Sequence, residues 1–581
     1  MANKIRARSF LSPTLVLLAF DWDDGPEFQD FLGFQIERKP GFDQEASSFL
    51  PNRLTFDGPA PEAGDVPSNE APIQKFMWWD ARIDNPHPGT RYEYTITPVR
   101  GQPNHLTPVT GAATKLEVVI PPHVERGIGV WFNRAVVSSQ AFTKIIQEMG
   151  IAPNQTPSEE KALKLRAWLS NGMESAFEHF FSSAKEVVGA IYHLTDDLWV
   201  VPALEKHADG GDAIGLVYDE GSSARQTMKK EHKKNPNEGA IEKLPTITFS
   251  KRTKTKIMHN KFLVSGQRLF EGQSRPETLL CGSANYTTGG LTSQANLLHT
   301  FESAELADQY LERYHLLTED LTLGKTAQHA AWLDPVTVGD AGVSVFFSPE
   351  PQDKRLSLNR VVESIHRARS SVLFCLFTPT DEILRQACFA VGDNGKMMFG
   401  LVNLIAESSG DLDEEGDLNA AELAQMQLYH RKYSDKPDVI DGRFFSPNHT
   451  PAGFLSELQL FPGEKPPPFP PVIIHHKFIV IDAETDSPVI YSGSANMSNA
   501  SQYGNDENLL EIRGSRRIAG IYLAEFMRLY EHYRARALFI RRQNEGSMTT
   551  FKLDGTSRWS KKYYEPGTPE ERSKRRMARE P

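Results

Sequence analysis

The first 122 residues alternate between apolar and polar side chains in a way that is typical of β-strands. Tyr92, Tyr94 and Ile96 are separated by single polar residues, as in a strand that buries one face. Three more segments have strand-like apolar content and are separated by turn residues: 15–22, 31–38 and 113–120. The pattern predicts an all-β domain over residues 1–122.

A turn signature precedes the two tyrosines of this strand. The order Pro88-Gly89-x-x-Tyr92-x-Tyr94 resembles a corner of fibronectin type III domains, and Trp22 stands where those domains carry a core tryptophan. The resemblance implies an all-β sandwich, which we expect either to bind a protein partner or to brace the rest of the chain.

From residue 123 onward, buried-strand patterns alternate with helical ones, and the whole arrangement occurs twice. In the first copy, the apolar run 187–194 precedes a helical stretch and a second apolar run at 214–217. In the second copy, the corresponding runs are 372–377 and 398–402. Strands that alternate with helices predict an α/β fold in each half. The two predicted halves are residues 123–338 and 339–545.

One polar motif marks each half. The first half contains His259-Asn260-Lys261 followed by Gly282-Ser283-Ala284-Asn285, and the second contains His475-His476-Lys477 followed by Gly493-Ser494-Ala495-Asn496. Because residues i and i+2 of a strand face the same side, the histidine and lysine of each motif project together. Two facing copies would form a pocket with two imidazoles, two ammonium groups, two amides and two hydroxyls, which suits a phosphoryl group.

Such a pocket can cleave a phosphodiester without a metal ion or another cofactor. One histidine attacks phosphorus while the other protonates the leaving oxygen, and the second then activates the water that releases the phosphohistidine. The lysines and asparagines can stabilise charge on the non-bridging oxygens. No metal-ligand cluster is predicted, because the adjacent His475 and His476 would point to opposite faces of a strand.

In the second half the motif extends to six residues: His475, Lys477, Asp482, Ser494, Asn496 and Glu507. This set resembles the phospholipase D superfamily, whose motif is His-x-Lys-x4-Asp, then Gly-Ser-x-Asn, then a glutamate. The resemblance implies two α/β halves related by a pseudo-twofold axis, with one active site at their interface. It also implies that Glu507 hydrogen-bonds the far ring nitrogen of His475, and that Asp482 is a structural anchor.

The first half departs from this motif in two places. Gly266 stands at the aspartate position, and Gln294-Ala295-Asn296 stands at the glutamate position. Some superfamily members, such as tyrosyl-DNA phosphodiesterases, also lack the aspartate and use an amide in one half. Gln294 and Asn296 are therefore the candidates for orienting His259. The resemblance implies that His259 is the nucleophile and His475 the general acid. The full set of expected catalytic side chains is His259, Lys261, Asn285, His475, Lys477, Asn496 and Glu507, supported by Ser283 and Ser494.

The substrate is less well determined than the reaction. A net charge of −11 and the usual activity of long two-motif members favour a phospholipid at a membrane surface, with release of its headgroup. A basic run before His259 favours instead a nuclease that acts on DNA or RNA. The residues of this run that would steer the substrate are Lys251, Arg252, Lys254 and Lys256. Gly266 and Ala295 motivate a third hypothesis, a binding protein with a decayed site.

Cysteine content and hydropathy indicate the setting. Three cysteines cannot form a disulfide framework and suit a reducing compartment. No apolar stretch approaches the ~20 residues that cross a bilayer as a helix. The run 15–20 follows basic residues and faintly resembles a signal peptide, but acidic residues replace its cleavage site. We therefore expect a strand there, and a cytoplasmic protein unless a specialised route secretes it.

Two inserts and the C-terminal tail lie outside the repeat. The acidic stretch 411–417 and the proline-rich segment 466–471 predict a loop or lid beside the site. Residues 546–581 are highly charged and are predicted to form a flexible tail. Its solvated end would include Arg572, Lys574, Arg575 and Arg576.

Overall fold

The computed structural model describes most of the chain. The described residues are 3–58, 65–83, 89–152, 155–352, 354–377, 379–405, 420–434, 437–442, 472–544 and 552–579. The acidic stretch 411–417, the proline-rich segment 466–471 and Pro88 lie outside them.

The N-terminal region contains two antiparallel sheets that share one core, and a short third sheet of β5 (Pro51–Asn52) and β6 (Val66–Pro67). The first sheet has the order β1 (Arg6–Ser12), β2 (Leu15–Asp21), β7 (Met77–Asp80). The second has the order β10 (Thr114–Val119), β8 (Arg91–Gln102), β3 (Phe31–Lys39), β4 (Ser48–Phe49), with β9 (His105–Pro108) beside β8. Trp22, Phe34 and Tyr94 pack together between the sheets. The predicted strands at 15–22, 31–38 and 113–120 are therefore present.

Each α/β half contributes one large sheet, and the two sheets have the same strand order. The first sheet is β11 (Val124–Glu125), β12 (Ile128–Phe132), β19 (Leu297–Glu302), β18 (Arg275–Gly282), β17 (Lys261–Gln267), β13 (Glu186–Ile191), β14 (Ile214–Asp219), β15 (Thr248–Arg252). The second is β20 (Val336–Val338), β21 (Ala341–Ser348), β27 (Asn505–Arg513), β26 (Val489–Gly493), β25 (Lys477–Ile481), β22 (Ser371–Leu376), β23 (Met397–Val402), β24 (Val439–Asp441). The short strand β16 (Ile257–Met258) joins the second sheet at β27.

The largest hydrophobic core lies between the two sheets, with two long helices inside it. Phe262 of β17 and Phe478 of β25 both belong to this core. The helices α8 (Ala304–Thr318) and α14 (Arg516–Asn544) contribute whole faces to it. Sheets that are apolar on both faces need such cover, which explains their nearly continuous apolar sequences.

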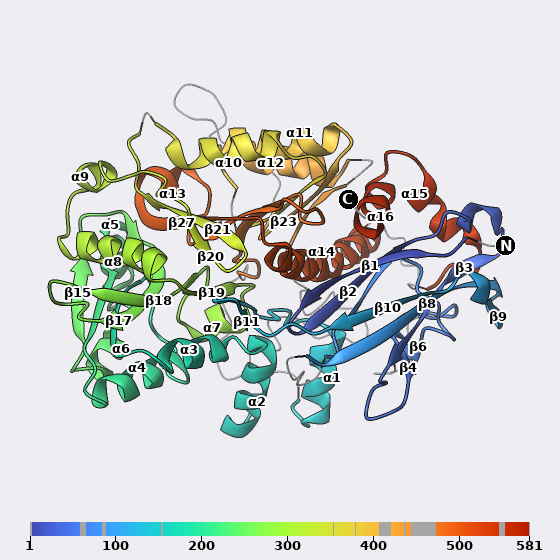
Figure 1. Ribbon diagram of the computed structural model, residues 1–581, viewed down its shortest axis with the longest axis horizontal. Coiled ribbons are helices and arrows are strands. Elements are labelled where there is room, and N and C mark those ends of the chain that lie inside the picture. Colours follow the sequence, from blue (N-terminus) through green and yellow to red (C-terminus); the bar gives the residue numbers. More distant parts are fainter. Residues whose placement is uncertain are drawn as a thin grey trace.

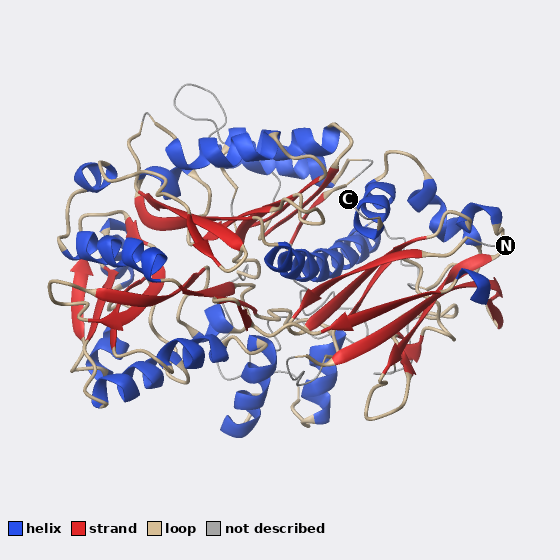
Figure 2. Cartoon of the chain, viewed as in Figure 1, coloured by secondary structure: helices blue, strands red, loops and turns tan. Residues whose placement is uncertain are grey.

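Separate helices cover the outer face of each sheet (Figure 2). The first sheet packs there against α3 (Glu174–Phe181) and α4 (Val200–Asp209). The second packs against α10 (Leu356–His366) and α11 (Glu382–Asp393). The other described helices between residues 123 and 545 are α1 (Gln140–Glu148), α2 (Glu159–Ser170), α5 (Ser222–Glu231), α6 (Glu238–Lys243), α7 (Thr288–Leu291), α9 (Leu323–Ala327), α12 (Ala420–Lys432) and α13 (Asn499–Tyr503).

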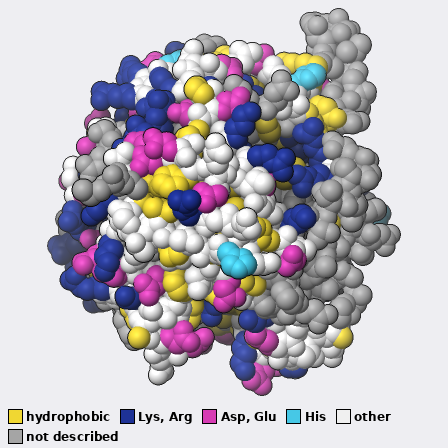
Figure 3. All heavy atoms as spheres, turned by 90° about the vertical axis from the view of Figure 1, so that its right-hand side faces the viewer, with side chains coloured by type: hydrophobic (Ala, Val, Ile, Leu, Met, Phe, Trp, Pro, Cys, Tyr) yellow, Lys and Arg dark blue, Asp and Glu magenta, His cyan; other side chains and the backbone are white. Residues whose placement is uncertain are grey.

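The β-sandwich is packed against the α/β part of the molecule. Leu15 and Leu17 of β2 enter the central core together with α14, and Figure 1 shows α14 between the sandwich and the second sheet. The outer face at this end carries interspersed basic and acidic side chains (Figure 3). No helix of the described chain has both the length and the apolar character that crossing a membrane requires.

The prediction of a flexible C-terminal tail is wrong for residues 552–579. They form a 3₁₀ turn (Ser557–Ser560), α15 (Lys561–Tyr564) and α16 (Pro569–Ala578). The indole of Trp559 donates a hydrogen bond to the carbonyl of Phe31 at 3.0 Å, and Met577 is fully buried. The Lys574 ammonium lies 2.9 Å from a carboxylate oxygen of Asp21. The tail is ordered because its apolar side chains are buried and its charged side chains form ion pairs and hydrogen bonds with the rest of the protein.

The other three basic residues that were predicted to form the solvated end also have partners. Arg572 donates to the carbonyl of Gly392 at 2.6 Å, and Arg575 lies 3.4 Å from Glu571 on the same helix. Arg576 donates to the Ser370 hydroxyl at 3.4 Å. The expected solvated end is therefore a contact surface with the sandwich and the second half.

Candidate active site

The two His-x-Lys segments have the same local geometry. Each begins a central strand, β17 or β25. The Lys261 ammonium donates to the carbonyl of His259 at 2.7 Å, and the Lys477 ammonium donates to that of His475 at 2.7 Å. All four residues are buried, the lysines completely. The neighbouring His476 packs in the core between Phe132 and Phe478, so it does not share the face of His475.

Each histidine is held by a strand of the opposite sheet. The segment before His259 forms β16, which pairs with β27, and the His259 N–H donates to the carbonyl of Asp506 at 2.9 Å. The segment before His475 bridges to Ala295, and the His475 N–H donates to the Ala295 carbonyl at 3.1 Å. The two sheets thus exchange backbone contacts at the two motifs.

The ring partners of the histidines are exchanged in the same way. Nδ1 of His259 lies 3.2 Å from Oε2 of Glu507, and Nδ1 of His475 lies 2.9 Å from Oδ1 of Asn296. The predicted pairing of Glu507 with His475 is therefore wrong, and so is the assignment of Gln294 or Asn296 to His259. The reason is the backbone exchange, because each ring meets the residue that follows its main-chain partner in the opposite strand.

Asn296 occupies the position in the first half that Glu507 occupies in the second. The Leu297 N–H donates to the Ser283 hydroxyl at 3.1 Å, as the Asn508 N–H donates to that of Ser494 at 3.0 Å. These matching hydrogen bonds make Asn296 the counterpart of Glu507. Aligning Leu297-Leu298 with Leu509-Leu510 in the sequence would instead make Asn296 the counterpart of Asn508. Ser283 also donates to Oδ1 of Asn296 at 2.9 Å. Both serines thus hold the strand that supplies a histidine partner.

The hydrogen bonds of Asn296 determine the tautomer of His475. Nδ2 of Asn296 donates to the carbonyl of Gly290 at 2.9 Å, so its Oδ1 faces the imidazole as an acceptor. Nδ1 of His475 must then carry a proton. The carboxylate of Glu507, 3.2 Å from Nδ1 of His259, favours the same tautomer there. In both rings Nε2 is left as the nitrogen available for chemistry.

Burial and the crowding of positive charge depress the basicity of the site. Burial, reinforced by Lys261, lowers the pKa of His259 to about 4. Burial also lowers the pKa of Lys477 to about 7, and burial together with Lys477 holds the pKa of Lys261 well below its usual value. Burial would raise the pKa of Glu507, but the adjacent His259 brings it below the ordinary carboxylate value. A bound anion would relieve this excess of buried positive charge.

Two aromatic rings flank the histidines, and neither belongs to the sequence motifs. The ring of Tyr192 lies 4.9 Å from that of His259, with the Lys261 ammonium 5.1 Å above it. The ring of Phe377 lies 5.6 Å from that of His475, with the Lys477 ammonium 5.7 Å above it. The signal was an aromatic residue just after β13 and β22.

The motif asparagines keep free acceptors at the site. Asn285 and Asn496 follow β18 and β26, and the Oδ1 atom of each is buried without a hydrogen-bond partner among the described residues. These oxygens can accept from a donor group of a ligand, and the Nδ2 groups of the same amides can donate to one. Within the same described ranges, no group of three or more His, Cys, Asp or Glu side chains is arranged to hold a metal ion.

Asp482 is a structural anchor, as the resemblance implied. Its carboxylate accepts backbone N–H bonds from Arg369, Ser370 and Ser371 at 2.9, 2.7 and 3.0 Å. The first half cannot repeat this at Gly266, where a Cβ atom would lie 2.3 Å from the carbonyl of Arg275. The difference concerns the fold and not the reacting groups.

The basic run before His259 is divided between structure and surface. Arg252 is fully buried and paired with Asp506, so the prediction that it steers substrate is wrong. The Lys251 ammonium lies 2.8 Å from Glu220, which reduces its effect at long range. Lys254 and Lys256 are exposed. Side chains alternate along a strand, which is why a basic sequence run does not form one basic surface.

Comparison with known proteins gives one family and several solved structures. The family model described as "Cardiolipin synthase, PLD-like domain" matches residues 177–317 and 361–530. No curated protein matches the chain. Phosphatidylserine synthase from Haemophilus influenzae is similar at 13% identity, over 70% of this chain and 90% of that one, with a TM-score of 0.38.

Two further solved structures are similar over smaller parts of the chain. Yeast tyrosyl-DNA phosphodiesterase is similar at 11% identity, over 58% of this chain and 86% of that one, with a TM-score of 0.29. The phospholipase D family member Nuc from Salmonella typhimurium is similar at 19% identity, over 33% and 95%, with a TM-score of 0.21. The family model covers more than half of the residues, and the chain therefore belongs to the phospholipase D-like family.

Proposed function

We propose that the chain is a phosphodiesterase that works through a covalent phosphohistidine, with lysines in place of a metal ion. The observation that carries the proposal is the exchange of ring partners between the halves. Glu507 and Asn296 engage Nδ1 of His259 and His475, so both rings present Nε2 to a common buried site that contains two ammonium groups. Nucleophile, acid and charge stabilisation are then supplied by side chains alone.

The proposed reaction has two displacements at phosphorus. Nε2 of His259 forms a bond to phosphorus, the bond to the leaving oxygen breaks, and Nε2–H of His475 gives that oxygen its proton. Neutral His475 then takes a proton from water, the water oxygen attacks phosphorus, and the bond to His259 breaks. The products are an alcohol and a phosphate monoester, and both histidines return to their starting protonation states.

The difference between the two ring partners supports this order of roles. A carboxylate 3.2 Å from His259 stabilises the positive charge that the ring acquires when it becomes phosphorylated. An amide fixes the orientation of His475 but adds no negative charge, so His475 gives up its proton more readily. These electrostatics favour His259 as the nucleophile and His475 as the general acid.

We propose that Lys261, Lys477, Asn285 and Asn496 bind the non-bridging phosphate oxygens. The lysines are buried and mutually repulsive, and each asparagine amide can donate from Nδ2 to a phosphate oxygen. A phosphoryl group with growing negative charge improves its interaction with such donors as the reaction proceeds.

The proposed substrate is a phospholipid, which would be cleaved to phosphatidic acid and a free headgroup. The matched family carries the description of a phospholipid enzyme, cardiolipin synthase. The net charge of −11 disfavours a polyanion, and the burial of Arg252 and pairing of Lys251 weaken the basic run that suggested nucleic acid. The decayed-site hypothesis loses part of its basis, since Asn296 and not Ala295 takes the glutamate position.

We further propose that the halves, residues 123–338 and 339–545, are related by a pseudo-twofold axis through one site. The identical strand order and the exchanged contacts at the two motifs support this arrangement. Residues 1–122 would be a fibronectin type III-like sandwich that braces α14, because its strands share the central core with that helix.

A turnover assay in EDTA tests the proposed function. Wild type and His475→Ala would be compared on mixed phospholipid vesicles and on single- and double-stranded nucleic acids. Headgroup release that disappears in the variant is the expected result. Polynucleotide cleavage with a steep salt dependence would make the chain a nuclease, and no turnover of any substrate would favour the binding protein.

A further inference from the structure

A buried cluster of charge lies directly behind His259. The guanidinium of Arg252 contacts both carboxylate oxygens of Asp506, at 2.9 Å from Nε and 3.4 Å from Nη2. Arg313 of α8 reaches the same carboxylate at 3.0 Å and also donates to the carbonyl of Ser348. Arg252 and Asp506 are fully buried, and Arg313 is 4% exposed. Two arginines therefore share one carboxylate away from solvent.

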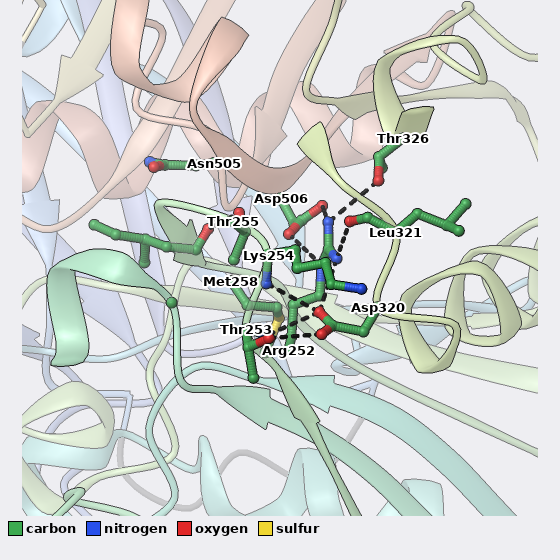
Figure 4. Close-up of polar contacts among 12 residues, drawn as sticks. Arg252, Thr253, Lys254, Thr255, Met258, Asp320, Leu321, Thr326, Asn505 and Asp506 are labelled. Carbon is green, nitrogen blue, oxygen red and sulfur yellow. Dashed lines mark hydrogen bonds and ion pairs between the residues drawn. The ribbon is translucent and has the colours of Figure 1, made fainter. Parts of the chain in front are cut away.

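Arg252 joins this carboxylate to the connection between α8 and α9. Its other donors reach Asp320 at 3.1 Å, the carbonyl of Leu321, and the Thr326 hydroxyl at 3.2 Å. Asp320 also accepts from the backbone of Thr253, at 2.8 Å. Figure 4 shows the guanidinium between Asp506 on one side and Asp320 on the other. One side chain from β15 thus fixes the second sheet to the connecting segment.

Asp506 connects the cluster to the candidate nucleophile. Its main-chain carbonyl accepts the His259 N–H at 2.9 Å, and the next residue, Glu507, contacts the His259 ring. Alternation along β27 turns the Asp506 side chain away from the ring and towards Arg252. Any movement of Asp506 therefore displaces the backbone partner and the ring partner of His259 together.

The second histidine has no such cluster among the described residues. Ala295 gives His475 the main-chain contact that Asp506 gives His259, and it has no side chain to anchor. At the end of β24, where β15 has Arg252, the second sheet has Asp441, which pairs with Lys432 at 2.7 Å. The anchoring of the ring partner by a buried ion cluster is therefore specific to the His259 side.

We propose that Arg252 is a positioning residue that acts through Asp506 to hold Glu507 against His259. The inference rests on the proposed function, in which His259 is the nucleophile. Glu507 is fixed within its own sheet by β21 and by hydrogen bonds from Ser501 and Asn505 to Oε1, but β16, the strand that leads to His259, is only two residues long. The reacting atom of a nucleophile must be placed to well within 1 Å, because a displacement of about 1 Å can lower the rate about 100-fold.

The experiment compares Arg252→Met and Arg252→Lys with a matched buried arginine elsewhere. Arg252→Met leaves Asp506 paired with Arg313, so no carboxylate is left alone in the interior. The control is Arg38→Met in the sandwich, where Arg38 is 4% exposed and donates to Asp80 at 2.9 Å. Thermal unfolding of all three variants would establish that they fold and how much stability each loses.

Two readouts separate positioning from general destabilisation. The first is kcat and KM on the substrate that the wild type turns over. The second is the rate at which diethyl pyrocarbonate modifies His259 relative to His475, mapped by peptide mass spectrometry. The second readout needs no turnover. It therefore still tests the positioning role if the proposed function fails because the wild type is inactive.

We expect Arg252→Met to lower kcat about 100-fold with KM within about 2-fold, and Arg252→Lys to recover part of the loss. The ratio of His259 to His475 modification should fall about 10-fold, because His259 loses the carboxylate that supports its basicity. Arg38→Met should change none of these quantities by more than about 2-fold. An unchanged modification ratio in Arg252→Met, or an equal loss of kcat in Arg38→Met, would overturn the proposal.

Discussion

The two histidines lie in similar frames but face different chemical groups. Each lies two residues before a central strand, the lysine that begins this strand donates back to its carbonyl, and an aromatic ring flanks it. His259 faces the carboxylate of Glu507, whereas His475 faces the amide of Asn296. A duplicated scaffold can therefore give two equivalent residues different chemistry through a single strand position.

The comparison also shows why neither half is complete by itself. The partner of His259 comes from the second sheet, and the partner of His475 comes from the first. The central core between the sheets, with α8 and α14, fixes the distance over which these partners must reach. Packing far from the site thus sets the geometry of both rings.

Replacing each histidine by alanine should have the largest effects, and it tests whether the two histidines have different roles. His259→Ala should lower kcat by ~10⁴-fold or more, because the covalent route is lost. His475→Ala should lower kcat by ~10²–10⁴-fold, the usual contribution of general acid–base catalysis. Steady-state kinetics on the substrate found for the wild type measures both. A substrate with a good leaving group needs no general acid, so it should restore kcat to His475→Ala but not to His259→Ala. If both variants lost the same factor in kcat with good and with poor leaving groups, the two histidines would not have distinct roles.

Glu507→Gln would make the two ring partners alike. We expect kcat to fall about 100-fold with little change in KM, because an amide keeps the orientation of His259 but not the charge that stabilises its phosphorylated form. Asn296→Gln is the matched control for altering the other partner, and it should cost about 10-fold. A smaller effect for Glu507→Gln than for Asn296→Gln would show that the carboxylate has no special role.

The pH profile of kcat/KM tests the electrostatic difference between the two histidines without any mutation. His259 must be neutral to attack, so kcat/KM should rise as pH increases through about 4, its buried pKa. Lys477 must be charged, so kcat/KM should fall as pH increases through about 7. The lowered pKa of His475, which burial and Lys477 cause, also moves the falling limb towards acid. An optimum at pH 8 or above would contradict this electrostatic description.

A substitution in the C-terminal segment should lower the stability of the protein without changing the chemistry of the two histidines. Trp559→Ala removes an indole that bonds Phe31 and packs on Phe76, so we expect a loss of about 3 kcal/mol of stability. The kcat of the folded variant should stay within about 2-fold of wild type. Chemical denaturation measures the first effect, and initial rates below the unfolding transition measure the second. A large fall in kcat would mean that the tail influences the site.

Much of the fold could be predicted from local sequence pattern. The strands 187–194 and 372–377, the sandwich strands and the duplicated motif all depend on residues that are close in the chain. The structure of residues 552–579 could not be predicted in this way. Their charges resemble a solvated tail until Lys574 is seen beside Asp21, which is more than 500 positions away in the sequence.

The candidate site also depends on contacts between residues that are far apart in the sequence. The four His and Lys residues follow from period-two spacing, but their partners depend on how the sheets meet. Glu507 was expected beside His475, and Gln294 or Asn296 beside His259, because each lies in the same half as that histidine, whereas the structure exchanges these partners. The burial of Arg252 was likewise unpredictable, since Asp506 reaches it from the opposite sheet.

The most direct test of the account is to locate the covalent phosphoryl group. His475→Ala would be mixed with substrate, quenched under alkaline conditions that preserve phosphohistidine, and mapped by peptide mass spectrometry. The account predicts an adduct on His259 that accumulates because the base that activates water is missing. Turnover in the wild type together with an adduct that maps to another residue in the variant, or with no adduct in either protein, would contradict it.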